Sequence, residues 1–116
     1  MNEKMEEIFE LKDKILKTEE EIEKIKEKNS EIKKKISKDD EKFGKFKYKY
    51  QKEEAIEQEI LNNESFLENE NDLKFYKKDI VLMKNRISRL NMEISIQKNK
   101  DLVGALRRIA DTIHGK

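Results

Sequence analysis

Residues 8–50 read IFELKDKILKTEEEIEKIKEKNSEIKKKISKDDEKFGKFKYKY, and apolar side chains recur in this stretch at alternating spacings of three and four residues. This spacing is a heptad repeat, which aligns a narrow apolar stripe along one side of an α-helix. Another helix must cover that stripe, so the pattern predicts a coiled coil. The residues of this first seam are Ile8, Leu11, Ile15, Thr18, Ile22, Ile25, Asn29, Ile32, Ile36, Asp39, Phe43, Phe46 and Tyr50.

The composition also favours long, solvated helices. Of the 116 residues, 46% are charged and 34% are hydrophobic, and the chain contains no proline, no tryptophan and three glycines. The net charge is only +1 and the isoleucines are periodic, which favours an ordered coiled coil over a disordered chain. Because the chain has no cysteine, we expect neither disulfides nor thiol chemistry.

A second seam follows and determines where the chain is expected to reverse. A reversal near Lys42 would place isoleucines of the first seam against Lys52 and Glu59, leaving buried polar groups unpaired at about 1–3 kcal/mol each. A turn at Asn62-Asn63 instead pairs Asn29 with Gln97 and joins the apolar residues of the two seams. The second seam consists of Leu73, Tyr76, Ile80, Met83, Ile87, Leu90, Ile94, Gln97 and Asp101.

We therefore predict an all-α fold, a long antiparallel helical hairpin forming a single coiled-coil domain over residues 1–116. The first helix runs from about residue 3 to 61, the turn covers 62–65, and the second helix covers about 66–113, with Ser65 and Glu68 as a capping box. Gly44 would then lie within the first helix, at a cost of about 1 kcal/mol. The predicted intramolecular seam contains Ile32, Ile36, Phe43, Phe46, Tyr50, Tyr76, Ile80, Met83, Leu90 and Ile94.

The second helix is also apolar on a second side, about 160° from its seam at 100° per residue. One hairpin covers only one side, so we expect two hairpins to associate through their second helices into a four-helix arrangement. A homodimer is expected, and a tetramer stays open. A parallel dimer, in which Asn29 pairs with its own copy, is an open alternative. The predicted oligomer interface is Phe75, Leu82, Met92, Ile96, Val103 and Leu106.

The two ends of the chain are candidates for binding a partner. Residues 81–116 carry eight Lys and Arg against three Asp and Glu, and residues 102–113 form an amphipathic face. Such a helix can dock on a partner helix or on an anionic membrane surface. The favoured interpretation, however, is that this segment caps the bundle against Ile15 and Ile22, next to an overhanging N-terminus. The partner-binding candidates are Met5, Ile8, Phe9, Leu102, Arg107, Arg108, Ile109 and Ile113.

The most unusual local composition is the aromatic and basic stretch KFGKFKYKYQK at residues 42–52. Lysines interleaved with aromatic residues can bind nucleic acid or an anionic membrane surface. Phe43, Phe46 and Tyr50 belong to the first seam, however, which leaves only Tyr48 free and favours a structural role. The near-zero net charge predicts weak phosphate binding and no specific nucleic-acid partner.

We predict a protein that is not an enzyme, with no catalytic residue, no cofactor and no metal site. The single histidine, His114, has no neighbouring sulfur or histidine ligand, and the glutamate runs fit solvated helix faces. The acidic beginning is followed by no apolar segment of a signal peptide, and no run approaches the roughly 18 apolar residues of a membrane span. We therefore expect a cytoplasmic chain without a membrane span, although peripheral membrane contact is open.

The opening MNEKMEEIFE, together with the size and the Lys, Glu, Ile and Asn usage, resembles small prophage accessory proteins of spirochaetes. The resemblance is to the BlyB-like soluble accessory proteins of Borrelia prophage plasmids, companions of a holin-like haemolysin. It implies a chaperone-like protein that binds and stabilises a short, membrane-active helical partner. The alternative function is a structural rod or spacer component of a phage or secretion assembly.

Overall fold

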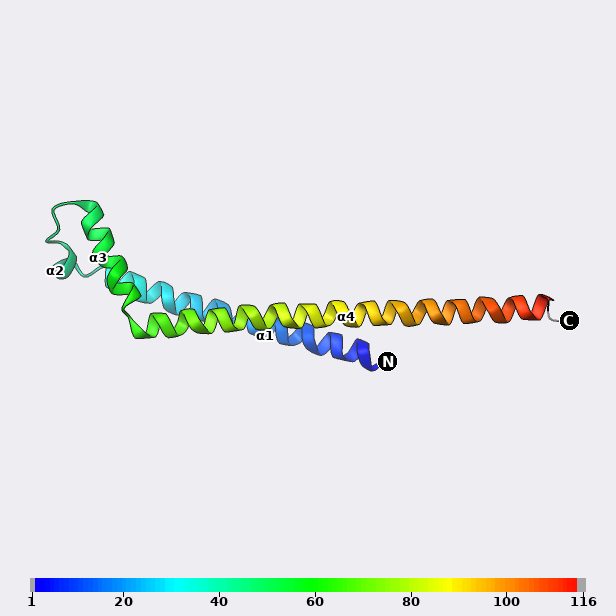
Figure 1. Ribbon diagram of the computed structural model, residues 1–116. Coiled ribbons are helices and arrows are strands. Elements are labelled where there is room, and N and C mark those ends of the chain that lie inside the picture. The colour runs from blue at the N-terminus through cyan, green and yellow to red at the C-terminus, as the bar shows by residue number, and fades with distance from the viewer. Residues whose placement is uncertain (1, 115–116) are drawn as a thin grey trace. The chain divides into compact units, whose positions relative to one another are not determined.

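The computed structural model describes residues 2–114, which form four helices and no strand (Figure 1). The helices are α1 (Glu3–Ser37), α2 (Asp40–Phe43), α3 (Lys49–Leu61) and α4 (Glu64–His114). The predicted all-α class, with two long helices, is confirmed. The predicted first helix is wrong in extent, because the segment expected to be continuous to residue 61 is divided into α1, α2 and α3.

Local chemistry between residues 38 and 44 explains why α1 ends at Ser37. Asp39, a polar position of the first seam, is the N-cap of α2, and its Oδ1 accepts a hydrogen bond of 3.1 Å from the Lys42 backbone N–H. Aspartate competes with helical hydrogen bonding in this way. Gly44 is the C-cap of α2, where a Cβ atom would collide with the Asp40 carbonyl oxygen. Gly44 therefore ends a helix instead of lying within one.

A helix boundary does occur at Asn62-Asn63, but it joins α3 to α4. Asn62 is the C-cap of α3, and Asn63 Oδ1 accepts a hydrogen bond of 2.9 Å from the Phe66 backbone N–H. Asn63 thus caps α4, which begins at Glu64. The predicted capping box at Ser65 and Glu68 is wrong, because these residues already lie inside the helix.

The chain divides into two compact units, and both contain parts of α1 and α4. We call residues Ile15–Ile80 the turn unit, and the residues up to Lys14 together with those from Val81 onward the end unit. The single coiled-coil domain over residues 1–116 stays a prediction. The buried apolar residues of the turn unit are Ile15, Ile22, Ile25, Phe43, Phe66, Leu73 and Ile80, and those of the end unit are Ile8, Met83 and Leu90.

Side-chain pairs fix the register within each unit, and it differs from the predicted one. In the turn unit, Asn29 accepts a hydrogen bond of 2.8 Å from Asn69 Nδ2, and its own Nδ2 donates to Glu70 Oε1 at 2.9 Å. The predicted pairing of Asn29 with Gln97 is wrong, because its actual partner, Asn69, lies four heptads before Gln97. Gln97 instead donates a hydrogen bond to Asp101 of its own helix. A heptad seam repeats every seven residues, so shifts by whole heptads preserve its apolar pattern.

In the end unit, α1 lies antiparallel to α4. Glu7 accepts two hydrogen bonds from Arg86, at 3.1 Å and 3.2 Å, and Lys4 Nζ lies 3.6 Å from a Glu93 carboxylate oxygen. The expectation that the first ten residues overhang the hairpin is therefore wrong.

The alternative dimer through Asn29 is also contradicted, because Asn29 is only 4% exposed and is paired within its own chain.

The predicted intramolecular seam is only partly buried. Phe43, Ile80, Met83 and Leu90 are buried, whereas Ile32, Ile36, Tyr76 and Ile94 are half-buried. Phe46 and Tyr50 are 41% and 64% exposed, so their assignment to the seam is wrong. They leave the seam because the chain departs from helical geometry between α2 and α3, and this interruption destroys the heptad phase.

Candidate partner-binding surfaces

The end unit contains a groove that both long helices line. Ile8 is its buried floor, whereas Met5 and Phe9 are 41% and 53% exposed at its rim. We call this the end groove. Its volume is about 210 Å³, and it is lined by Met5, Ile8, Phe9 and Lys12 of α1 and by Asn91, Ile94 and Lys98 of α4.

Polar contacts beside the end groove hold α1 against α4. The paired hydrogen bonds between Glu7 and Arg86 raise the pKa of Arg86, first through the bonds themselves and then through the attraction of the Glu7 charge. The guanidinium is therefore charged at every physiological pH. Lys12 and Lys98 line the groove. An apolar floor flanked by lysines suits an amphipathic helix that carries acidic residues beside its apolar face.

Residues 95–114 of α4 form what we call the C-terminal extension. Every residue in it is exposed except Gly104 and Ala105, which are half-buried. The line of α4 that carries Leu90 and Ile94 continues into the extension with polar residues, including Gln97 and Asp101, so there is no apolar seam on that side. The exposure of Leu102, Leu106, Ile109 and Ile113 contradicts the expectation that this segment caps the bundle.

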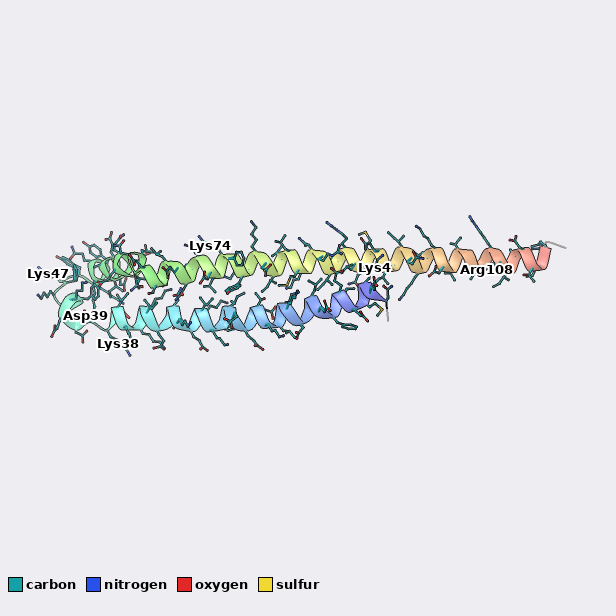
Figure 2. The ribbon with its side chains drawn as sticks, turned by 90° about the horizontal axis from the view of Figure 1, so that it is seen from below. Lys4, Lys38, Asp39, Lys47, Lys74 and Arg108 are labelled. Atoms are coloured by element: carbon teal, nitrogen blue, oxygen red, sulfur yellow. The ribbon has the colours of Figure 1, made fainter. Side chains whose placement is uncertain are left out.

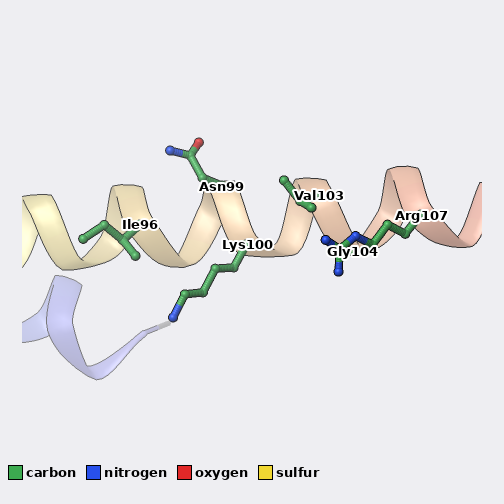
Figure 3. Close-up of a pocket in the computed structure, with 6 residues that line it drawn as sticks. All are labelled: Ile96, Asn99, Lys100, Val103, Gly104 and Arg107. Carbon is green, nitrogen blue, oxygen red and sulfur yellow. The ribbon is translucent and has the colours of Figure 1, made fainter.

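The apolar side chains of the extension lie on another side of the helix. Ile96 and Val103 are 48% and 47% exposed and line a shallow groove along α4, together with Asn99, Lys100, Gly104 and Arg107 (Figure 3). Arg107 and Arg108 are exposed, and Arg108 Nε donates to the Gly104 carbonyl at 3.4 Å. The extension is thus an amphipathic helix in which Lys100 and Arg107 border the apolar side chains of Ile96 and Val103.

All six residues of the predicted oligomer interface are exposed. Phe75 and Leu82 are 67% and 58% exposed, and the Phe75 ring makes an edge contact with Tyr76 at 5.9 Å between ring centres. Met92 and Leu106 are likewise 64% and 56% exposed. Exposure is the condition that an interface requires, and self-association itself stays a prediction.

The aromatic and basic stretch is more exposed than its sequence suggested. Tyr48 and Tyr50 are stacked at 5.8 Å between ring centres, and Lys47 Nζ lies 5.6 Å from the centre of the Tyr48 ring. Figure 2 shows Lys47 at the outside of the segment that connects α2 to α3. Lys42 is held in a 2.6 Å ion pair with Glu59. The interpretation that only Tyr48 is free is wrong, because Phe46 and Tyr50 are exposed as well.

Sequence reasoning missed a second groove, in the turn unit. The Ile56 and Ile60 side chains on α3 are half-buried, and Lys33 Nζ lies 5.5 Å from the centre of the Phe66 ring. The four-residue spacing of the two isoleucines was the available signal, since it places both on one face of a helix. The groove has a volume of about 320 Å³ and is lined by Lys33, Glu53, Ile56, Glu57, Ile60, Leu61 and Phe66.

Neither a metal-binding cluster nor a membrane-spanning helix is present within residues 2–114. No group of three or more His, Cys, Asp or Glu side chains in this range could hold a metal ion. No helix in the same range is both long enough and apolar enough to cross a membrane. The predictions about metals, cofactors and enzymatic activity stay predictions.

The chain was compared with protein-family models, with curated proteins and with solved structures, and none of the three comparisons finds a match.

Proposed function

We propose that this chain is a non-enzymatic helical accessory protein that self-associates and binds an amphipathic helix of a partner protein. The observation that carries the proposal is the exposed apolar surface of the end unit, at the rim of the end groove and along the C-terminal extension. Large apolar side chains that gather on one face of an exposed helix mark interaction sites more often than scattered ones do.

The end groove has the features that helix binding requires. A buried floor at Ile8 lies between the exposed Met5 and Phe9 side chains, and Lys12 and Lys98 supply positive charge. An amphipathic helix can lay its apolar face on such a floor while acidic residues approach the lysines. Covering the partner's apolar face would keep that partner soluble, because the apolar area leaves contact with water.

The partner that fits is a short, membrane-active helical protein of the holin-like type. An amphipathic helix of this kind aggregates or enters membranes when its apolar face is free. The resemblance to prophage accessory proteins points to the same class of partner. A chaperone-like role needs apolar binding surface and no reactive groups, which is why we propose a protein that is not an enzyme.

For self-association, we propose that two chains join through the outer face of α4, in a four-helix arrangement with α1 outside. Support comes from the exposure of the six predicted interface residues between Phe75 and Leu106. Sedimentation velocity at micromolar concentration tests this part: a discrete dimer or tetramer is expected, and a monomer throughout would remove it.

Partner binding is tested with a synthetic amphipathic helical peptide that has one apolar face and acidic residues beside it. The protein should keep this peptide in the supernatant, and Phe9→Ser should reduce the retained amount at least about fivefold by removing the groove rim. Leu16→Ser is the matched control, because Leu16 is 60% exposed on α1 and does not line the groove. Equal retention by the two variants would contradict the proposal.

A structural rod or spacer is the alternative function. The observation in its favour is the length of α4, a single helix of 51 residues with exposed apolar side chains along it. A spacer component should polymerise without a size limit as its concentration rises, whereas an accessory protein should stop at a discrete oligomer. Co-purification from the native host then distinguishes a membrane-active helical partner from particle proteins.

A further inference from the structure

We propose that the C-terminal extension forms a parallel two-stranded coiled coil with the extension of a second copy of this chain, in which Asn99 pairs with Asn99. This inference rests on the self-association proposed above, and it adds the location, the orientation and the register of the contact. The occupant of the exposed apolar face is thus this chain itself.

Five side chains of the extension recur at heptad spacing. Asn99, Leu102, Leu106, Ile109 and Ile113 alternate at three and four residues, which assigns them to the a and d positions of a heptad. Asn99 occupies an a position in this frame. At 100° per residue, Asn99 and Arg108 lie on opposite sides of the helix.

This seam lies on the side of α4 that faces away from the hairpin seam. The hairpin seam of the end unit includes Leu90, which is 1% exposed, and its line continues through Gln97, Asp101 and Arg108. These three polar residues give the extension no apolar face on the hairpin side. The apolar seam of the extension is on the opposite side of α4 and is therefore not a continuation of the seam that packs against α1.

Asn99 identifies a second copy as the occupant. The asparagine amide both donates and accepts hydrogen bonds, so two copies related by a two-fold axis satisfy one another. The turn unit already contains such a pair, since Asn29 and Asn69 are joined at 2.8 Å in a buried seam. An apolar groove or the acyl region of a membrane would offer the Asn99 amide, at the start of this seam, no hydrogen-bond partner.

The charges of the extension agree with this arrangement. With Asn99 at an a position, Lys100 and Arg107 are at b positions, and Asp101 and Arg108 are at c positions. All four therefore lie away from a partner helix. The residues that flank the seam toward the partner are mostly small or apolar, including Val103 and Ala110, so no like charges oppose each other across the contact.

The orientation follows from the position of Asn99. In a parallel pair every layer meets its own copy, so the apolar stretch from Leu102 to Ile113 is covered along its length. An antiparallel pair centred on Asn99 would place Ile109 against Arg89 and Ile113 against Asn85. The parallel pair avoids burying those polar side chains against isoleucine.

The exposed area is sufficient for a stable dimer. Six apolar side chains of the extension, between Ile96 and Ile113, are 47% to 67% exposed. At about 100 Å² each they offer roughly 600 Å² per chain, or roughly 1,200 Å² for the pair, which is the lower end of the range of standard protein interfaces. The extension therefore needs no further surface of α4 to hold two copies together.

Cysteine cross-linking tests the proposal directly, because the chain has no cysteine of its own. Under mild oxidation Leu102→Cys should form at least about tenfold more disulfide-linked dimer than Arg108→Cys, which lies on the opposite side of the helix. Both side chains are exposed, so neither change should unfold the hairpin, and circular dichroism checks this. Equal cross-linking by the two variants would overturn the proposal.

Two further measurements separate the possible failures. Mixed Met92→Cys and Leu106→Cys chains should cross-link to each other no better than chance, and strong enrichment of the mixed dimer would establish the antiparallel pair instead. If the wild-type chain is a dimer, and the Leu82→Cys variant cross-links whereas the Leu102→Cys variant does not, only this inference is overturned and the proposed self-association stands. A wild-type chain that stays monomeric at about 100 µM, where a contact of this size should be populated, overturns both.

Discussion

Asn29 and Asn99 each occupy a position of a heptad seam, Asn29 between two isoleucines and Asn99 at the start of an apolar stretch, and their surroundings differ. Asn29 is 4% exposed and bonded to Asn69 and Glu70 of α4, whereas Asn99 lies on an exposed face of the same α4 helix. The residue pattern is alike in both regions. The difference teaches that a heptad seam shows a need for a facing helix and does not show which helix meets it.

The two regions also differ in what stabilises them. The helices of the turn unit bury apolar side chains against one another, and this burial is the main source of helix stability in proteins. An isolated helix of about 20 residues is marginal in water. The C-terminal extension should therefore depend on a second copy for its order, whereas the Asn29 region should not.

The largest expected effect contrasts two leucines of α4. Leu90→Ala should lower the free energy of unfolding by about 2–5 kcal/mol, because Leu90 is 1% exposed and its removal leaves a cavity. Leu106→Ala, at a side chain that is 56% exposed, should change it by less than about 0.5 kcal/mol at concentrations where the chain is monomeric. Urea unfolding measures both. Similar losses would mean that the extension is packed within its own chain.

The next effect concerns the buried amide pair. Asn29→Ala should cost about 1–3 kcal/mol, because the Asn69 amide then loses its buried partner. Replacing both asparagines by leucine should cost little stability but should loosen the register, because a shift by one heptad then buries no unpaired amide. Spin labels at Lys24 and Lys74 in the turn unit should report one distance in the wild type and several in the double variant.

Hydrogen exchange compares the two regions without any substitution. Amides of residues 98–113 should exchange faster than those of residues 20–29 in dilute protein, because only the segment 20–29 has buried seam residues. Protection of residues 98–113 should rise with protein concentration if a second copy covers them, and protection of residues 20–29 should not. Protection that is independent of concentration in both segments would contradict the proposed dimer.

A smaller effect is expected at the connection that ends α1. Gly44→Ala should cost about 1 kcal/mol or more, because the new Cβ atom would meet the Asp40 carbonyl oxygen and the backbone must move. Gly104→Ala is the matched control, since the nearest atom to a Cβ there is the end of the Arg108 side chain at 4.0 Å. A stabilising Gly44→Ala would indicate that residues 38–48 prefer the continuous helix that the sequence pattern suggested.

The smallest effect belongs to the exposed Glu7 and Arg86 pair. Arg86→Met should lower stability slightly, and the difference should shrink in about 0.5 M salt because both side chains are solvated. The Arg86 pKa is raised in the folded chain, so its contribution is complete below the ordinary arginine pKa and is lost only at higher pH. Arginine titration should therefore leave the difference constant between about pH 6 and pH 9.

The heptad pattern of the sequence correctly predicted the helical class and many of the buried residues, but the register predicted from it is wrong. The seam of α4 extends backward from Leu73 through Asn69 to Phe66 at the same spacing, so the true partner of Asn29 was already visible in the pattern. Both Asn69 and Gln97 offer an amide at this seam. Shifts by whole heptads conserve the apolar pattern, and so periodicity does not choose between them.

Some features of the candidate surfaces were predicted from the sequence and others were not, for a related reason. The exposure of Phe9, Val103 and Leu106 follows from amphipathic patterning, but Ile8 proved to be a groove floor because α1 pairs with α4 up to Lys4. The exposure of Phe46 and Tyr50 depends on the interruption of the helix at Asp39 and Gly44. Helix ends of this kind are set by a few hydrogen bonds and steric contacts, and heptad patterns do not contain them.

By itself, the sequence determined that this chain forms long amphipathic helices, because apolar side chains at heptad spacing form stripes along an otherwise highly charged chain. Only the tertiary structure decided where α1 ends, that Asn29 meets Asn69, and that the extension beyond Ile94 is left exposed. The physical reason is that helix formation depends on neighbours along the chain, whereas register depends on which of several equivalent seams can satisfy its polar groups.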